Sequence, residues 1–186
     1  MKLVVVRYSA GNVKSVEFAL KRLGIEAIVS DDFEVLRSAD KIIFPGVGNA
    51  ASAMRSLKEK GLDQLIPTLK QPVLGICLGM QLLCLHTEEG DTLGLGIIPL
   101  RVRKFSDNLK VPHTGWNTIH DLKGDLFYQV PENEYMYFVH SYYAETGKET
   151  IATCDYGIPF SAAIQKDNFY GVQFHTELSA EAGSRI

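Results

Sequence analysis

The sequence predicts an α/β protein with three layers. A mixed, mostly parallel sheet is flanked by helices, and antiparallel strands are added from the second half of the chain. Two observations predict this fold. In the first half, short apolar runs alternate with segments of helical spacing, and such alternation forms parallel sheets through right-handed crossovers. In the second half, short strand-like runs follow one another between Gly, Pro and Asp-Asn turns.

The elements of the first half follow from local signals. Asn12 stands where it can cap a helix that Gly24 ends. A second helix is expected from about Ala50 to Lys60, and a third is expected over Met80–Leu85. Short runs rich in apolar residues are the expected parallel strands: Leu3–Val6, Ala27–Val29, Lys41–Phe44 and Val73–Ile76.

The second half carries the expected antiparallel strands. These runs are short, and turn residues separate them: Leu100–Phe105, Tyr135–Val139, Ser141–Ala144, Ile151–Cys154, Phe160–Gln165 and Phe169–Phe174. No linker, composition shift or internal repeat divides the chain. We therefore expect residues 1–186 to form one domain.

Composition excludes several classes of function. A net charge of −3 argues against nucleic acid as a partner, because phosphate binding needs a concentrated basic patch. No apolar run reaches membrane-spanning length, so no membrane partner is expected. Three cysteines without metal-site spacing fit reduced thiols in a cytoplasmic protein. We expect no metal and no cofactor, since the remaining histidines also lack ligand spacing: His86, His113 and His120.

The segment Gly75-Ile76-Cys77-Leu78-Gly79 is the most informative one in the chain. An apolar run precedes it and a helical pattern follows it, which is the arrangement of a nucleophile elbow. Glycines suit the sharp turn, and a helix start activates a thiol. Cys77 is the predicted nucleophile, and the N–H of Leu78 is a predicted oxyanion donor. A buried cysteine at a strand end is the alternative interpretation.

His175 is the best-placed base for this thiol. It ends the run Gly171–Phe174, and Glu177 lies two residues further on. At extended spacing, residues i and i+2 face the same way, so the Glu177 carboxylate is expected beside the ring. A nucleophile needs such a base and a third group to orient it. A surface His-x-Glu pair is the alternative.

The segment Pro45-Gly46-Val47-Gly48 also follows an expected strand. If its strand neighbours that of the elbow, the amides of Val47 and Gly48 can complete an oxyanion site. The two glycines would let this segment flip, which would make the site conditional. An ordinary strand-to-helix turn accounts for Pro and Gly equally well.

These motifs together resemble those of triad-type (class I) glutamine amidotransferases, through the block Gly75–Leu83 and through Phe174-His175-x-Glu177. Further blocks resemble, more narrowly, the glutaminase subunits of imidazole glycerol phosphate synthases. They occur in order over nearly the whole chain: Tyr8–Ser15, Pro45–Gly48, Val111–Asn117 and Tyr137–Tyr143.

The resemblance implies an activity and a partner. Cys77 would attack the side-chain amide of glutamine, with His175 moving protons and Glu177 orienting the ring. The ammonia would pass to a cyclase subunit with a β/α barrel, in histidine biosynthesis. The oxyanion and glutamine-positioning residues would be Gly46, Val47, Gly48, Leu78, Gln81, Ser141 and Tyr142. The interface or gating residues would be Asn12, Trp116, Asn117 and Tyr137, although core packing is the alternative for Trp116.

The chain departs from the family pattern at three places. Arg7 and Ser9 replace the usual Asp and Gly of the first turn, Thr176 replaces the Pro of His-Pro-Glu, and Leu178 replaces a Lys. Thr frees a backbone that Pro would hold, so a looser His–Glu geometry is expected. Three alternatives stay open: a paralogue that feeds another synthase, a non-catalytic scaffold for a partner, and an α/β hydrolase or peptidase.

Overall fold

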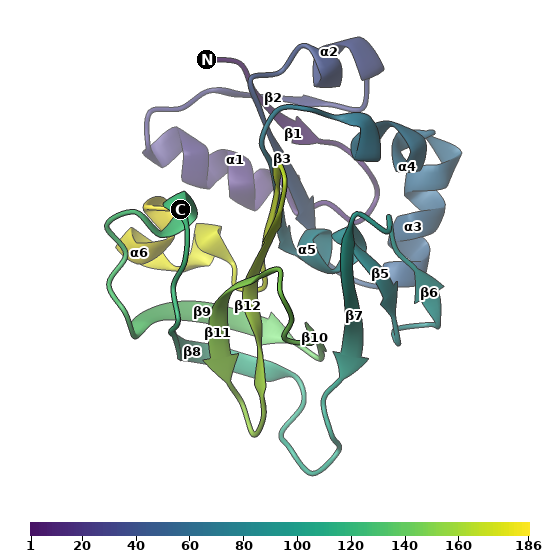
Figure 1. The fold of residues 1–186 in the computed structure, drawn as a ribbon. Coiled ribbons are helices and arrows are strands. Elements are labelled where there is room, and N and C mark those ends of the chain that lie inside the picture. Colours follow the sequence, from purple (N-terminus) through teal and green to yellow (C-terminus); the bar gives the residue numbers. More distant parts are fainter.

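The computed structural model describes residues 1–186 and confirms the predicted fold class. A seven-stranded sheet has the order β11-β12-β13-β4-β3-β1-β2 (Figure 1). Five of its strands are parallel: β1 (Leu3–Val6), β2 (Ala27–Ser30), β3 (Lys41–Gly46), β4 (Val73–Cys77) and β13 (Phe169–Val172). Two antiparallel strands extend the sheet at one edge: β11 (Thr150–Asp155) and β12 (Pro159–Lys166).

Helices and smaller sheets cover both faces of this sheet. Along β1, Val4 and Val6 join one buried cluster while Leu3 and Val5 join the other, as expected from the alternation of side chains along a strand. The first cluster packs against α2 (Phe33–Arg37), α3 (Ala50–Glu59), α4 (Leu62–Leu65) and the 3-10 turn Ile66–Thr68. The second packs against α1 (Val13–Arg22).

Two smaller sheets, formed by residues from Cys84 to Ala144, are separate from the main sheet. One has the order β10-β7-β5-β6, from Tyr142–Ala144, Ile98–Lys104, Cys84–Thr87 and Thr92–Leu93. The other pairs β8 (His113–Ile119) with β9 (Glu134–His140) in antiparallel register. The chain also contains the 3-10 turns Asp125–Phe127 and Thr176–Leu178, and the final helix α6 (Ala180–Ser184).

Three local predictions were wrong. The helix expected over Met80–Leu85 is α5 (Leu78–Leu83), and it ends one residue before β5 begins. The strand β8 was missed, because His113–Ile119 is largely polar and becomes a strand through its pairing with β9. Asn12 precedes α1, but its side chain makes no capping hydrogen bond.

The parallel strands bring several loops to one edge of the sheet. Gly46 at the end of β3 is in register with Cys77 at the end of β4, and Val172 at the end of β13 is in register with Ile76. The segments that follow β3, β4 and β13 therefore emerge side by side. Open α/β sheets bind ligands at this carboxyl edge.

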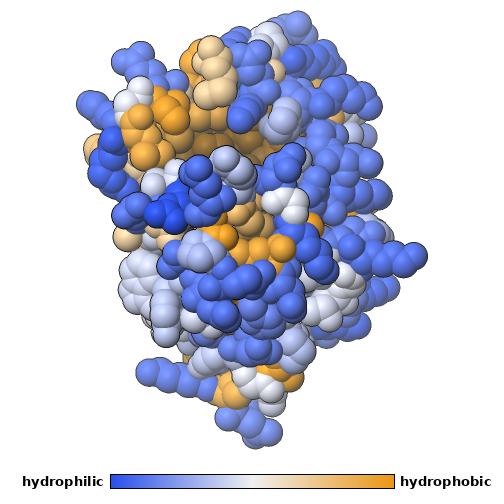
Figure 2. Space-filling model, turned by 60° about the vertical axis from the view of Figure 1, so that its left-hand side comes forward, coloured by the Kyte–Doolittle hydropathy of each residue, from blue (hydrophilic) through white to orange (hydrophobic).

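An apolar cleft of about 520 Å³ lies between α1 and the C-terminal segment. Figure 2 shows apolar, orange surface inside a hollow of this face. Its walls include Val16 and Leu20 of α1, together with Ile43 and Leu74 of the sheet. Cys77 and His175 do not line the cleft, but Ile76 and Glu177 do, so it adjoins the cysteine site described below.

Candidate active site

The cysteine stands at a strained turn between β4 and α5. Cys77 has φ 53° and ψ −110°, a conformation that non-glycine residues rarely adopt. The surroundings leave no room beside it. A Cβ at Gly79 would lie 1.9 Å from the Phe44 carbonyl oxygen, and one at Gly75 would lie 2.8 Å from the Met80 nitrogen. Strain that the surrounding structure enforces is common at functional sites, and this turn is the elbow that the sequence predicted.

His175 and Glu177 form a buried pair. His175 Nδ1 and Glu177 Oε1 are 2.9 Å apart, and the two side chains are only 4% and 3% exposed. The predicted contact is present, but the predicted backbone was wrong. Residues 176–178 form a 3-10 turn rather than extended chain, and this turn swings the carboxylate back toward the ring. The geometry is formed with Thr176 in place of the family's Pro, and Glu177 Oε2 is left without a hydrogen-bond partner.

The thiol and the imidazole interact. Burial by itself lowers the pKa of His175, but hydrogen bonding to Cys77 and Glu177, together with their charges, raises that pKa to about 10. The ring is therefore protonated at neutral pH. An imidazolium beside a cysteine stabilises the thiolate, which is the nucleophilic form.

Gln173 is a residue of this site that the sequence analysis missed. Its Nε2 lies 3.6 Å from Cys77 Sγ, and its Oε1 accepts a hydrogen bond from Gln81 Nε2 at 2.9 Å. The side chain is fully buried. A single Gln between Val172 and Phe174, directly after the strand β13, was the available signal, because buried amides are retained only where they are hydrogen-bonded.

The predicted glutamine-positioning residues lie on neighbouring segments. Gln81 Nε2 also donates to the Tyr142 carbonyl oxygen at 2.9 Å, which links α5 to β10. The Ser141 carbonyl oxygen accepts the N–H of Phe105, so this segment is held from both sides. The structure thus brings Gln81, Ser141 and Tyr142 to one region beside Gln173.

The segment 46–48, predicted to supply oxyanion donors, is held so that the Val47 N–H does not face a bound oxyanion. The Val47 N–H donates to the Ala10 carbonyl oxygen at 2.6 Å, and Tyr8 Oη donates to the Pro45 carbonyl oxygen at 2.7 Å. The amide of Val47 is thus occupied. Leu78 is the first residue of α5, so its own N–H has no acceptor within the helix.

Comparisons with known proteins agree with this geometry. The sequence profile of the family described as "Glutamine amidotransferase class-I" matches residues 4–185. The chain belongs to the class-I glutamine amidotransferases. It is 57% identical to the "Imidazole glycerol phosphate synthase subunit HisH" of Bacteroides fragilis, over all of this chain and 96% of that protein. It is 46% identical to the protein of the same name from Pasteurella multocida, over 98% and 93% of the two chains.

Solved structures show the same fold at low sequence identity. A crystal structure of a glutamine amidotransferase aligns with TM-score 0.77 at 18% identity, over 99% of this chain and 95% of that one. A glutamine amidotransferase from Thermotoga maritima aligns with TM-score 0.66 at 16% identity, over 100% and 80%. This amidotransferase therefore shares its architecture with distant members of the class.

The predicted interface residues of this amidotransferase lie on two elements. Trp116 on β8 is 52% exposed and packs edge-on against Tyr137 on β9, with ring centroids 5.8 Å apart. The alternative of core packing for Trp116 was wrong. Asn117 is half-buried and bonds to Asp155 and His113. Asn12 lies apart from them, in the loop before α1.

The departures from the family pattern do not prevent the contact between His175 and Glu177. The side chain of Arg7 forms a salt bridge with Asp31, with 2.6 Å between Arg7 Nη2 and Asp31 Oδ1. Leu178 is 47% exposed. No group of three or more His, Cys, Asp and Glu side chains is arranged to hold a metal ion. None of the helices has the length and apolarity that crossing a membrane requires.

Proposed function

We propose that this chain is the glutaminase subunit of an imidazole glycerol phosphate synthase in histidine biosynthesis. It hydrolyses glutamine to glutamate and ammonia, and it hands the ammonia to a cyclase subunit with a β/α barrel in a heterodimer. The close relatives support the choice of synthase, since those from two organisms carry that name at 57% and 46% identity over nearly their full length. The observation that carries the chemistry is the buried pair of His175 and Glu177 interacting with Cys77.

In the first half-reaction, the Cys77 thiolate attacks the side-chain amide carbon of glutamine. The carbonyl oxygen takes up the electron pair and becomes an oxyanion. When this intermediate collapses, the C–N bond breaks and His175 gives its proton to the nitrogen, which leaves as ammonia. A glutamyl thioester on Cys77 remains, and the imidazole is now neutral.

In the second half-reaction, a water molecule attacks the thioester. His175 takes one of its protons, and the C–S bond breaks as the new intermediate collapses. The new carboxylic acid loses its proton to solvent and leaves as glutamate, and the thiolate and imidazolium are restored. Glu177 keeps the proton of Nδ1 in place through both steps, so that Nε2 faces the sulfur and the water.

The oxyanion site is proposed to be conditional. Leu78 donates from the start of α5, and Gly46, Val47 and Gly48 supply the second donor once their segment has turned. The bond from the Val47 N–H to Ala10 supports this proposal, because that amide has to be released first. Loss of one oxyanion donor costs roughly 10²–10³ in rate in other enzymes, so the isolated chain is expected to be nearly idle.

The partner surface is proposed to include Trp116, Asn117, Tyr137 and Asn12. An exposed Trp that packs against a Tyr supports this assignment, since aromatic anchors dominate protein interfaces. Gln81, Ser141 and Tyr142 position the glutamine. The chain acts as one domain over residues 1–186 in the cytoplasm, without a cofactor, a metal or a nucleic-acid partner.

Glutamate release from glutamine tests the proposal. It is measured for the wild type by itself, and with the cyclase and its substrate. We expect turnover that depends on the partner. Cys77→Ala should lower it by at least roughly 10⁴-fold, as removal of a nucleophile does in other triads.

Cys154→Ala is the matched control, because Cys154 is a buried thiol outside the site. It should keep wild-type turnover. Full activity of the isolated chain would refute the conditional oxyanion site. Absence of turnover with the cyclase, but turnover with a different synthase, would favour the paralogue. Absence of turnover with any partner would favour the scaffold.

A further inference from the structure

Two buried histidines lie in direct contact outside the catalytic triad. His113 begins β8 and His140 ends β9, where the two residues face each other across the hairpin. His113 Nδ1 and His140 Nε2 are 3.0 Å apart. Both residues are almost fully buried, at 4% and 6% exposure. The mechanism proposed above uses neither of them.

The outer end of this pair determines where the protons lie. Asn117 Nδ2 donates to the backbone carbonyl oxygen of Asp155 at 2.9 Å. A carbonyl oxygen can only accept, so the nitrogen of the Asn117 amide is identified by this bond. The amide nitrogen of Asn117 is therefore the group that also faces His113 Nε2, at 3.3 Å. That ring nitrogen accepts, so the single proton of a neutral His113 ring is on Nδ1 and points at His140.

The inner end gives the same direction independently. His140 Nδ1 lies 2.8 Å from the Tyr142 carbonyl oxygen, which can only accept. The proton of a neutral His140 ring is therefore on Nδ1, and its Nε2 accepts from His113. The four groups form one relay that runs from Asn117 through His113 and His140 to the Tyr142 carbonyl.

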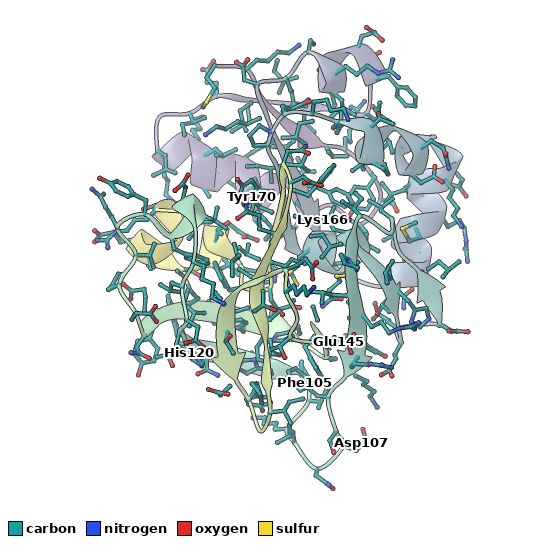
Figure 3. The ribbon with its side chains drawn as sticks, in the orientation of Figure 1. Phe105, Asp107, His120, Glu145, Lys166 and Tyr170 are labelled. Carbon is teal, nitrogen blue, oxygen red and sulfur yellow. The ribbon has the colours of Figure 1, made fainter.

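The surroundings keep both rings neutral. Phe138 and Tyr156 stack on His113, with centroids 5.0 Å and 4.0 Å away. Phe105 lies 5.2 Å from the ring of His140, and Figure 3 labels it near the lower end of β7. Burial lowers the pKa of His113 to about 4 and that of His140 to about 3. A second proton on either ring would set two donors against each other.

The relay ends on the atom that orients Gln81. The Tyr142 carbonyl oxygen accepts from both His140 Nδ1 and Gln81 Nε2. The second N–H of Gln81 Nε2 donates to Gln173 Oε1. Its own Oε1 makes no hydrogen bond within the chain and is not among the buried unpartnered atoms, so it can accept from a ligand.

We propose that His113 and His140 are positioning residues for glutamine. Their relay holds the Tyr142 carbonyl, and with it the substrate-binding segment 141–142 and the amide of Gln81. This inference rests on the proposed function, in which these groups contact the substrate. Neither histidine exchanges a proton with glutamine.

Substitution of His140 separates positioning from packing. His140→Phe keeps the aromatic volume and removes the donor to Tyr142. His140→Asn restores a donor at the place of Nδ1. In the complex with the cyclase, we expect His140→Phe to raise the KM for glutamine roughly tenfold with kcat within about twofold, because the Tyr142 carbonyl loses one of the two donors that hold it. His140→Asn should recover most of this loss.

His120→Phe is the matched control. His120 is also hydrogen-bonded at both ring nitrogens, but by the exposed carboxylates of Asp121 and Asp155; Figure 3 labels it beside β11. It should leave KM unchanged. The proposal is overturned if His140→Phe leaves KM within twofold of wild type, or if His140→Asn is as impaired as His140→Phe.

Two measurements keep the relay testable when turnover or folding fails. Calorimetric binding of glutamine to a complex carrying Cys77→Ala, with and without His140→Phe, reports positioning without chemistry. It therefore separates failure of the relay from failure of the proposed function. In the wild type, nitrogen-15 spectra of the histidine rings should show neutral rings protonated at Nδ1 for both residues, and a proton on Nε2 of either ring would overturn the proposal.

Discussion

The turn that carries Cys77 and the turn after β3 lie side by side, yet glycine serves a different purpose in each. At the elbow, Gly75 and Gly79 are required by space, because a Cβ would meet backbone atoms at 2.8 Å and 1.9 Å. In the neighbouring turn, Gly48 has open space around it and a φ of +91°. Gly46 resembles the elbow glycines, since its Cβ would lie 2.6 Å from the Gly79 nitrogen.

This difference separates what is preformed from what has to move. Close packing against β3 and α5 leaves the elbow only one arrangement, so the Cys77 side chain is in place before any ligand arrives. The outer part of the second turn is held mainly by one hydrogen bond, from Val47 to Ala10. A single hydrogen bond is worth about 1 kcal/mol, which a partner can readily outweigh.

The largest expected effect contrasts two glycine substitutions. Gly79→Ala should prevent folding or cost more than about 3 kcal/mol, because a Cβ cannot share space with the Phe44 carbonyl oxygen. Gly48→Ala should cost about 1–2 kcal/mol, from its positive φ alone. Denaturant unfolding measures both. Equal losses would contradict the distinction between the two turns.

Alkylation of the isolated chain sharpens the comparison. At pH 7.5, Cys77 should react with iodoacetamide at least a hundredfold faster than Cys84 and Cys154. Burial raises the pKa of each of those two thiols to about 12, whereas Cys77 lies beside the His175 imidazolium. Mass spectrometry of the labelled peptides gives the rates. Equal labelling, or labelling of Cys77 only after the cyclase is added, would mean that the elbow is not preformed.

A smaller effect concerns pH. The pKa of His175 is raised from 6.5 to about 10 in the folded chain. The stability it contributes is fully present below about pH 6.5 and is lost as the pH rises toward 10. Between pH 7 and pH 9.5, the wild type should therefore lose free energy of unfolding, mainly above about pH 8.5, where the thiol of the unfolded chain also gives up its proton.

Glu177→Gln should lose less over the same range, because the carboxylate is one of the groups that raise this pKa. Each unit of pKa shift is worth about 1.4 kcal/mol. Urea titrations at the two pH values measure the difference, with His120→Asn as the control for a histidine outside the site. Identical pH dependence in wild type and Glu177→Gln would contradict the raised pKa.

Local patterns predicted the elements whose signals lie within a few residues. The elbow is one, because an apolar run, two glycines and a helical pattern all occur between Val73 and Leu83. The contact between His175 and Glu177 was also predicted, but its 3-10 backbone was not. That turn is stabilised by packing from elsewhere, including the Ser179 hydroxyl, which donates to the His175 carbonyl and accepts the Tyr137 N–H.

Other features had no local signal. The strand β8 exists because β9 lies beside it, and a polar run alone does not predict a strand. Gln173 acquires its role from Gln81 and Cys77, which lie 92 and 96 residues away in the chain. Such a contact leaves no spacing pattern in the sequence.

The sequence by itself determined the order of strands and helices in the first half, the cysteine elbow, the contact between His175 and Glu177, and the family resemblance, because these depend on residue type and short-range spacing. Only the tertiary structure decided which hydrogen-bonding groups are already occupied. The Val47 amide is bound to Ala10, and the two buried histidines form a chain of hydrogen bonds that ends on the Tyr142 carbonyl oxygen beside Gln81. These hydrogen bonds join residues that are far apart in the chain. Each polar group buried away from water needs a hydrogen-bond partner, because leaving it unpaired costs free energy.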